Sequence, residues 1–114
     1  MEEHRFAFQQ LDVYRIALEF ARRVQQARIN DPELNDQATR AAKSTFLHIC
    51  EGLPNESAGL RRKYFTGANT SLCEAVGALD LARELGALSS EMGAPLQEIA
   101  WRLKHMLRGL RSSR

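Results

Sequence analysis

Residues 37–52 read Gln37-Ala38-Thr39-Arg40-Ala41-Ala42-Lys43-Ser44-Thr45-Phe46-Leu47-His48-Ile49-Cys50-Glu51-Gly52, and they carry the strongest structural signal in the chain. Small and apolar residues recur there at helical spacing, which predicts one amphipathic helix. The predicted buried stripe consists of Ala38, Ala41, Ala42, Thr45 and Ile49, with Phe46 half a turn away. Because small side chains let a neighbouring helix approach closely, we interpret this surface as a packing surface and not as a reaction centre.

Three further segments have the same helical periodicity. The four predicted helices span about residues 11–29, 32–51, 57–85 and 90–111. Asp31 and Ser57 are suited to be N-caps, Pro32 fits the first position of the second helix, and Gly52 is expected to be the left-handed residue past its end. No segment has the pattern of a strand, and the connections are short. We therefore predict an all-α fold, an antiparallel up-down-up-down four-helix bundle.

Two features add to this prediction. Pro95 lies inside the fourth predicted helix and lacks an amide hydrogen, so we expect a kink or a restart of the helix at Ala94-Pro95. Large residues also fall outside the main stripes, namely Val13, Phe20, Phe46, Phe65, Val76 and Trp101. These apolar residues are more than the core of a single chain needs. They form a second apolar face, which predicts self-association.

Length and composition indicate one domain over residues 1–114. A chain of this size buries about two thirds of its unfolded surface, and 44% hydrophobic with 26% charged residues is typical of a folded protein. No apolar run approaches the ~20 residues that span a bilayer. The acidic N-terminus lacks the order of a signal peptide, so we expect a soluble, cytoplasmic protein without membrane contact.

The reactive residue types do not form a recognisable site. His48 and Glu51 share a helical face, but Cys50 points away from them, and no Glu-x-x-His pair typical of bundle metal centres occurs. Cys50 and Cys73 are too few for a disulfide framework, and we interpret them as small, partly buried core residues. The glycines form no phosphate-binding loop. We therefore predict a non-enzymatic protein with no catalytic residue, metal or cofactor.

Arg40 is open to two interpretations. It is either a solvent-exposed helix residue or one partner of a partly buried ion pair with Glu51 or Glu74 inside the bundle. A buried pair of this kind would set the register of the bundle, because removing one partner leaves an unpaired charge.

Positive charge is concentrated in three runs, although the formal net charge is only +2. They lie at the end of the first helix (Arg22, Arg23, Arg28), at the start of the third (Arg61, Arg62, Lys63) and along the fourth (Arg102, Lys104, Arg108, Arg111), where no acid follows Glu98. Charged runs are often only solvated surface. The sharper hypothesis is binding of RNA or DNA through its phosphates, because guanidinium groups match phosphate geometry. Few aromatic residues accompany these runs, so we expect no base stacking and weak sequence specificity.

Three segments of the chain carry motifs of a known family. Leu11-Asp12-Val13-Tyr14 with Ala17 is similar to its opening Leu-x-Val-Trp/Tyr-x-x-Ala. Gln37, Arg40-Ala41-Ala42, Ser44, Ile49 and Glu51-Gly52 match its central Gln-x-x-Arg-Ala-Ala-x-Ser-Ile-Pro-x-Asn-Ile-Ala-Glu-Gly, and the third-helix pattern is matched by Ala68, Ser71-Leu72, Glu74, Leu79, Ala82, Leu85-Gly86 and Leu88. On these motifs the chain resembles the four-helix-bundle family that includes the 23S rRNA intervening-sequence proteins and the accessory variability determinant (Avd) of diversity-generating retroelements.

The resemblance implies a homopentameric ring without catalytic activity. It also implies a basic surface that, in the retroelement branch, binds nucleic acid and a reverse transcriptase. Two functions follow, a nucleic-acid-binding bundle like the intervening-sequence proteins or an Avd-like protein adaptor for a reverse transcriptase. The chain departs from the family at Phe46, which replaces a proline and predicts a straighter second helix, at Thr45, which replaces an isoleucine, and at His48, which replaces an asparagine.

Overall fold

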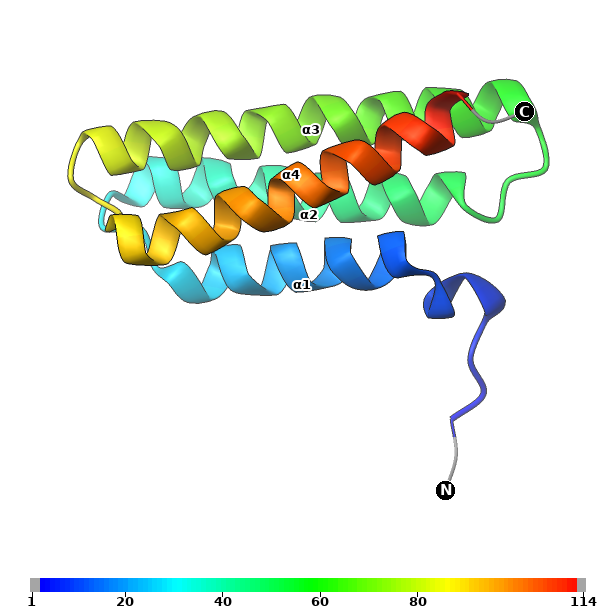
Figure 1. Ribbon diagram of the computed structural model, residues 1–114, viewed down its shortest axis with the longest axis horizontal. Coiled ribbons are helices and arrows are strands. Elements are labelled where there is room, and N and C mark those ends of the chain that lie inside the picture. Colours follow the sequence, from blue (N-terminus) through cyan, green and yellow to red (C-terminus); the bar gives the residue numbers. More distant parts are fainter. Residues whose placement is uncertain (1–2, 113–114) are drawn as a thin grey trace.

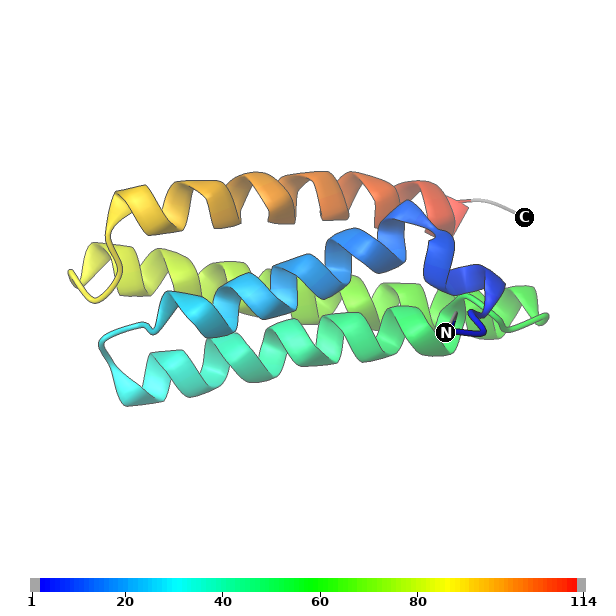
Figure 2. The same ribbon diagram turned by 90° about the horizontal axis from the view of Figure 1, so that it is seen from below.

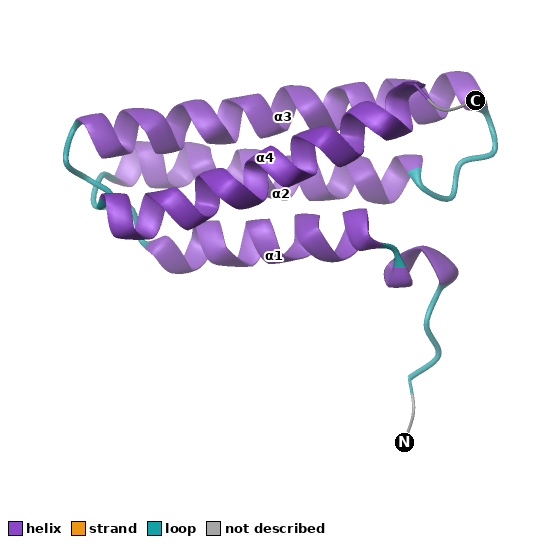
Figure 3. Ribbon diagram, viewed as in Figure 1, coloured by secondary structure: helices purple, strands orange, loops and turns teal. Residues whose placement is uncertain are grey.

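The computed structural model describes residues 3–112 and contains four long helices. They are α1 (Asp12–Ala27), α2 (Pro32–Gly52), α3 (Ala58–Glu84) and α4 (Ser90–Ser112), preceded by a short 3₁₀ helix, η1 (Ala7–Gln10). No strand occurs among the described residues (Figure 3). The predicted all-α class with four helices is therefore confirmed.

The four helices lie side by side, and each packs against two others (Figures 1 and 2). α1 and α3 each contact both α2 and α4. The short connections at residues 28–31, 53–57 and 85–89 reverse the chain, so successive helices run antiparallel. This arrangement places the start of α3 and the end of α4 at the same end of the molecule (Figures 1 and 2).

The core contains most of the large residues that we had placed on a second apolar face. Phe20 and Phe65 are fully buried, Val13 is 7% exposed, and Phe46 packs against the core while half-buried. The prediction of a second face is wrong for these residues. Each helix packs against two neighbours, and the wide apolar stripe is needed to contact both of them in the core. Trp101 differs from them, since 52% of it is exposed.

α2 makes its most extensive contact with α3, as the small residues of segment 37–52 predict. The Oγ atoms of Ser44 and Ser71 lie 2.8 Å apart across this contact. Gly52 is not a left-handed residue beyond the helix, as we had predicted, but the last residue of α2. A Cβ atom there would lie 2.6 Å from Cε1 of Phe65, so glycine is required for the close approach of α3.

The predicted N-caps are present at both positions. Asp31 Oδ1 accepts a hydrogen bond from the Leu34 amide (3.0 Å), and Ser57 Oγ accepts one from the Leu60 amide (3.3 Å). These bonds satisfy amides that lack a partner within the helix. α1 ends at Ala27, two residues before its predicted end, because Arg28 adopts a left-handed conformation with φ of 50°.

α4 does not restart at Pro95. It is one continuous helix from Ser90, with Ser89 Oγ accepting a hydrogen bond from the Met92 amide (3.2 Å). The proline removes the hydrogen bond to the carbonyl of Glu91, one turn earlier. Both residues are exposed, so water can solvate that carbonyl and the helix continues.

η1 was not predicted, because four residues are too few to show a period. It places Phe8 against Tyr14 of α1, with ring centroids 5.7 Å apart. Tyr14 in turn contacts Phe46 of α2 at 5.2 Å. The aromatic side chain that replaces the family's proline therefore packs against α1, and α2 continues through it without a break.

Candidate nucleic-acid interface

Two of the predicted basic runs meet at one end of the bundle. The last turn of α4 lies beside the first turn of α3, because the two helices are antiparallel (Figure 1). A hollow of about 390 Å³ separates them, lined by Asn55, Glu56, Ala58, Arg61, Arg62, Leu110 and Arg111. Arg62 and Arg111 therefore border the same space, with Glu56 as the carboxylate among the lining residues.

Arg61 is engaged in holding the turn between α2 and α3. Its Nη1 atom donates hydrogen bonds to the carbonyl oxygens of Leu53 (2.6 Å), Gly52 (3.2 Å) and Asn55 (3.3 Å). The guanidinium carbon lies 5.3 Å from the centroid of the Phe65 ring. Because the last carbonyls of a helix lack partners and carry partial negative charge, a guanidinium fits this position. Arg61 therefore has a structural role at this turn, and its binding of nucleic acid stays a prediction.

The next two residues are exposed. Arg62 borders the hollow, and Nζ of Lys63 lies 5.9 Å from the centroid of the Tyr64 ring. Within residues 3–112, neither side chain forms an ion pair. Both charges therefore remain available to an anion.

The four basic residues of α4 do not share one face. At 3.6 residues per turn, Lys104, Arg108 and Arg111 project from the same side, whereas Arg102 projects roughly 160° away from Lys104. Lys104 and Arg111 border hollows shared with α3, which identifies the common face as the one beside α3. We call Arg62, Lys63, Lys104, Arg108 and Arg111 the basic edge; Arg102 lies outside it.

Arg111 has an unsatisfied donor at this edge. Its Nε atom is buried and has no hydrogen-bond partner among the described residues. A buried donor without an acceptor is costly, so an anion placed in the adjoining hollow would satisfy it.

Arg40 does not form the partly buried pair that one interpretation predicted. Its side chain is 79% exposed and pairs with Asp36, one turn earlier in α2, with Nε and Oδ2 3.4 Å apart. Arg40 and Glu74 do border one open hollow between α2 and α3, but they form no ion pair, and Glu51 is exposed. Asp36 is the nearer partner because residues four apart on a helix are neighbours.

The polar contact that does link α2 and α3 was missed from the sequence. Ser44 Oγ lies 2.8 Å from Ser71 Oγ and 3.2 Å from Nδ1 of His48, which also donates to the Ser44 carbonyl at 2.8 Å. The His48 ring rests on Gly67, where a Cβ atom would lie 2.6 Å from its Cδ2. The sequence signal for this close contact was Gly67, a glycine inside the third predicted helix.

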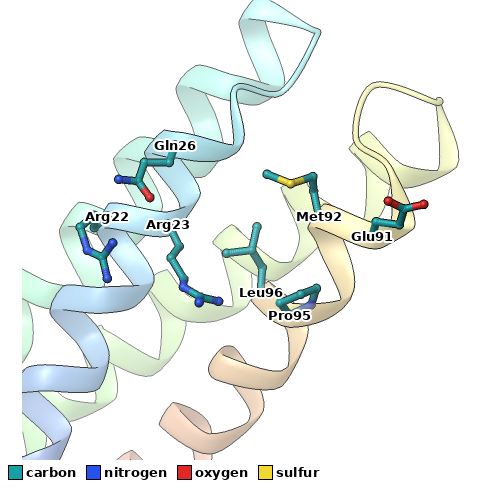
Figure 4. A pocket seen from close by; sticks show the side chains of 7 residues that line it. All are labelled: Arg22, Arg23, Gln26, Glu91, Met92, Pro95 and Leu96. Atoms are coloured by element: carbon teal, nitrogen blue, oxygen red, sulfur yellow. The ribbon is translucent and has the colours of Figure 1, made fainter.

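The third basic run lies at the other end of the bundle. Arg22 and Arg23 border a hollow of about 310 Å³ between α1 and α4, with Gln26, Glu91, Met92, Pro95 and Leu96 (Figure 4). Figure 4 shows Arg23 extending from α1 toward Leu96 and Pro95. The hollow is walled mainly by apolar side chains on α4, so these arginines are not part of the basic edge.

Within residues 3–112 the two cysteines lie in different surroundings. Burial, and secondarily the charge of Glu51, raises the pKa of the Cys50 thiol, which disfavours a thiolate. Cys73 is exposed and not in the core as we had interpreted it. In the same range no three His, Cys, Asp or Glu residues gather as a metal site, and no helix is long and apolar enough to cross a membrane.

Comparisons with known proteins place the chain beside one family. Residues 9–109 match the family model described as 23S rRNA-intervening sequence protein. A crystal structure of a protein of unknown function from the S23 ribosomal protein family of Bacteroides thetaiotaomicron superposes with a TM-score of 0.80. It is 18% identical and covers 89% of this chain and 99% of its own, so the likeness establishes the fold. The comparison with curated proteins gives no match.

Proposed function

We propose that this protein, which belongs to the 23S rRNA-intervening sequence protein family, is a non-enzymatic, cytoplasmic RNA-binding protein that holds the phosphate backbone at its basic edge. One observation carries the proposal: Arg62 and Arg111, distant in sequence, border the same hollow. The family description, which names ribosomal RNA, favours RNA as the ligand.

The chemistry of the basic edge supports binding of phosphate. Guanidinium groups form paired hydrogen bonds to phosphate oxygens, and the buried Nε of Arg111 lacks an acceptor. Lys104 and Arg108 continue the same face of α4, so several phosphates of one strand can be neutralised together. Glu56 limits the site, because its charge would repel a phosphate placed close to it.

The surroundings of Ser44 and His48 support the non-enzymatic part of the proposal. A serine beside a histidine is a pairing used for nucleophile and base in enzymes. Ser44 and His48 lie within hydrogen-bonding distance, but Ser44 Oγ also contacts Ser71, and Nδ1 of His48 donates to a backbone carbonyl. The other side of the His48 ring rests on Gly67. These groups are therefore used in helix packing.

Assembly as a homopentameric ring is part of the same proposal. It is supported by large apolar side chains outside the single-chain core, such as Leu47 (56% exposed), Leu81 (47%) and Leu85 (62%). In a ring each basic edge is repeated by symmetry, which multiplies a modest charge per chain. Light scattering on the purified protein tests it, with an expected mass five times that of the chain. A monomer would contradict the ring.

The adaptor hypothesis, with a reverse transcriptase as partner, stays a prediction.

Two matched substitutions on α4 test RNA binding. Arg108→Gln and Arg102→Gln remove the same charge from exposed positions on different sides of one helix. Affinity for a short RNA, followed by fluorescence anisotropy at 50 to 200 mM salt, should fall for Arg108→Gln, with the salt slope reduced by about 0.7 to 1. Arg102→Gln should match the unmodified protein.

Three results would contradict the proposal. They are an affinity that does not depend on salt, equal losses for the two variants, or full binding by the triple variant K104Q/R108Q/R111Q. Arg61 is left intact in these variants, because its loss would disturb the turn after α2.

A further inference from the structure

A second hollow continues the basic edge along the line where α3 and α4 meet. It has a volume of about 220 Å³ and is lined by Asn69, Leu72, Cys73 and Val76 of α3 and by Gln97, Ala100, Trp101 and Lys104 of α4. We call it the α3–α4 groove. Lys104 belongs to both the groove and the basic edge, so a ligand held by one reaches the other.

Trp101 gives the groove an accessible aromatic wall. The residue is 52% exposed, although a tryptophan this large is usually mostly buried. Nζ of Lys104 lies 5.0 Å from the centroid of its ring, and the His105 ring meets it edge-on at 4.5 Å. An aromatic ring beside a cation on an open surface is the arrangement on which nucleobases stack.

Asn69 supplies a polar group on the opposite wall. Its Oδ1 atom is buried and has no hydrogen-bond partner among the described residues. Gln97, on the α4 side, adds a second amide. Amides pair with the donors and acceptors on the edge of a base, so the groove offers both a stacking surface and an edge contact.

We infer that the α3–α4 groove binds one unpaired base of a single-stranded RNA, stacked on Trp101 with its edge toward Asn69. The inference rests on the proposed function, because the phosphates of the same strand lie on Lys104, Arg108 and Arg111. Trp101 and Arg111 are separated by about 15 Å along α4, the rise of ten helical residues, which accommodates a short run of nucleotides. The volume of the groove is below that of sites for drug-sized ligands, as expected for one base.

A paired base cannot take this position. In a duplex each base is stacked on both faces and its pairing edge is occupied, whereas loops and single strands leave bases free to stack on side chains. The groove therefore predicts a preference for single-stranded over double-stranded RNA. The inference differs from our expectation of no base stacking, which followed from the low aromatic content of the sequence.

The test compares a 12-nucleotide single-stranded RNA with the same sequence in a duplex. Trp101 is the only tryptophan in the chain, so its fluorescence reports on the groove directly. Single-stranded RNA should quench it, and Trp101→Leu should weaken single-strand binding about 5- to 100-fold, the effect of losing one stacked base. Trp101→Phe should retain most of the affinity. Asn69→Ala should weaken single-strand binding and leave duplex binding unchanged.

Gln25→Ala, at an exposed position of α1 and outside the α3–α4 groove, is the control and should bind as the unmodified protein does. If both RNAs bind equally and Trp101→Leu changes neither affinity, base stacking is wrong and backbone binding stands. If neither RNA binds, the proposed function fails together with this inference. A change in solution mass in Trp101→Leu would also overturn the inference, because it would identify Trp101 as a contact between copies of the chain.

Discussion

α3 packs along two lines with different chemistry, one against α2 and one against α4. Against α2, Ser44 and Ser71 approach within 2.8 Å, and Gly67 lets the His48 ring lie on the backbone. Against α4, Trp101 stays exposed and Asn69 has an unpaired amide oxygen. Small residues thus allow close packing of α3 against α2, whereas an open groove remains between α3 and α4. The difference is consistent with a role of the α2–α3 contact in stability and with the binding role that we propose for the α3–α4 groove.

The largest effect is expected from filling the closed contact. Ser71→Leu adds carbon atoms where Ser44 Oγ lies 2.8 Å away and removes the contact of that hydroxyl with α3. The free energy of unfolding, measured by urea denaturation, should fall by about 3 kcal/mol. Thr70→Leu, one residue earlier and exposed, should change it by less than about 0.5 kcal/mol. Equal effects of the two variants would show that the α2–α3 contact is loosely packed.

Neighbouring arginines should separate stability from binding. Arg61→Gln removes the donor to three carbonyl oxygens, at the end of α2 and in the turn after it, and should lower the free energy of unfolding by about 2 kcal/mol. Arg62→Gln should leave stability unchanged and weaken RNA binding, since its side chain is exposed beside Arg111. Urea denaturation and anisotropy on both variants check this. The reverse pattern would contradict both assignments.

Two glycines of α3 offer a smaller and more local comparison. Gly77 has no atom within 4 Å of an added Cβ, so Gly77→Ala should stabilise the protein by up to ~1 kcal/mol through helix propensity. At Gly67 the added Cβ meets the His48 ring, so Gly67→Ala should destabilise it by about 1 kcal/mol despite the same propensity gain. Thermal unfolding distinguishes the signs. Stabilisation by both substitutions would mean that the His48 ring moves freely.

The smallest effect concerns the two cysteines. Cys73 is exposed in the α3–α4 groove, whereas burial raises the pKa of Cys50. Because the thiolate is the reacting form, a raised pKa leaves less of it at any pH below that pKa. Iodoacetamide at pH 8 should therefore label Cys73 several-fold faster than Cys50, as followed by peptide mass spectrometry. Single-stranded RNA should slow the labelling of Cys73 only. Faster labelling of Cys50 would place it on an open surface.

The sequence patterns were sufficient for the helices and their caps, because periodicity and capping act over a few residues. Asp31, Ser57 and the small stripe of segment 37–52 were read correctly for this reason. The site was predicted less well. Arg61 looked identical to Arg62 in sequence, and only the position of the α2 carbonyls separates the two. Trp101 was placed with Phe20 and Phe65 on a second apolar face, because a periodic pattern does not show which side of a helix lacks a neighbour.

The amino-acid sequence specified the number of helices, their approximate ends, the family and the sign of the charge on its runs, since each follows from local spacing and composition. It could not specify that Arg62 and Arg111 share a hollow, that Arg102 lies outside it, or that Lys104 links the basic edge to Trp101. Those facts depend on how antiparallel helices bring distant residues together and on the rotation of each helix about its own axis. Packing of the whole core sets that rotation, because each helix turns its widest apolar stripe toward two neighbours at once.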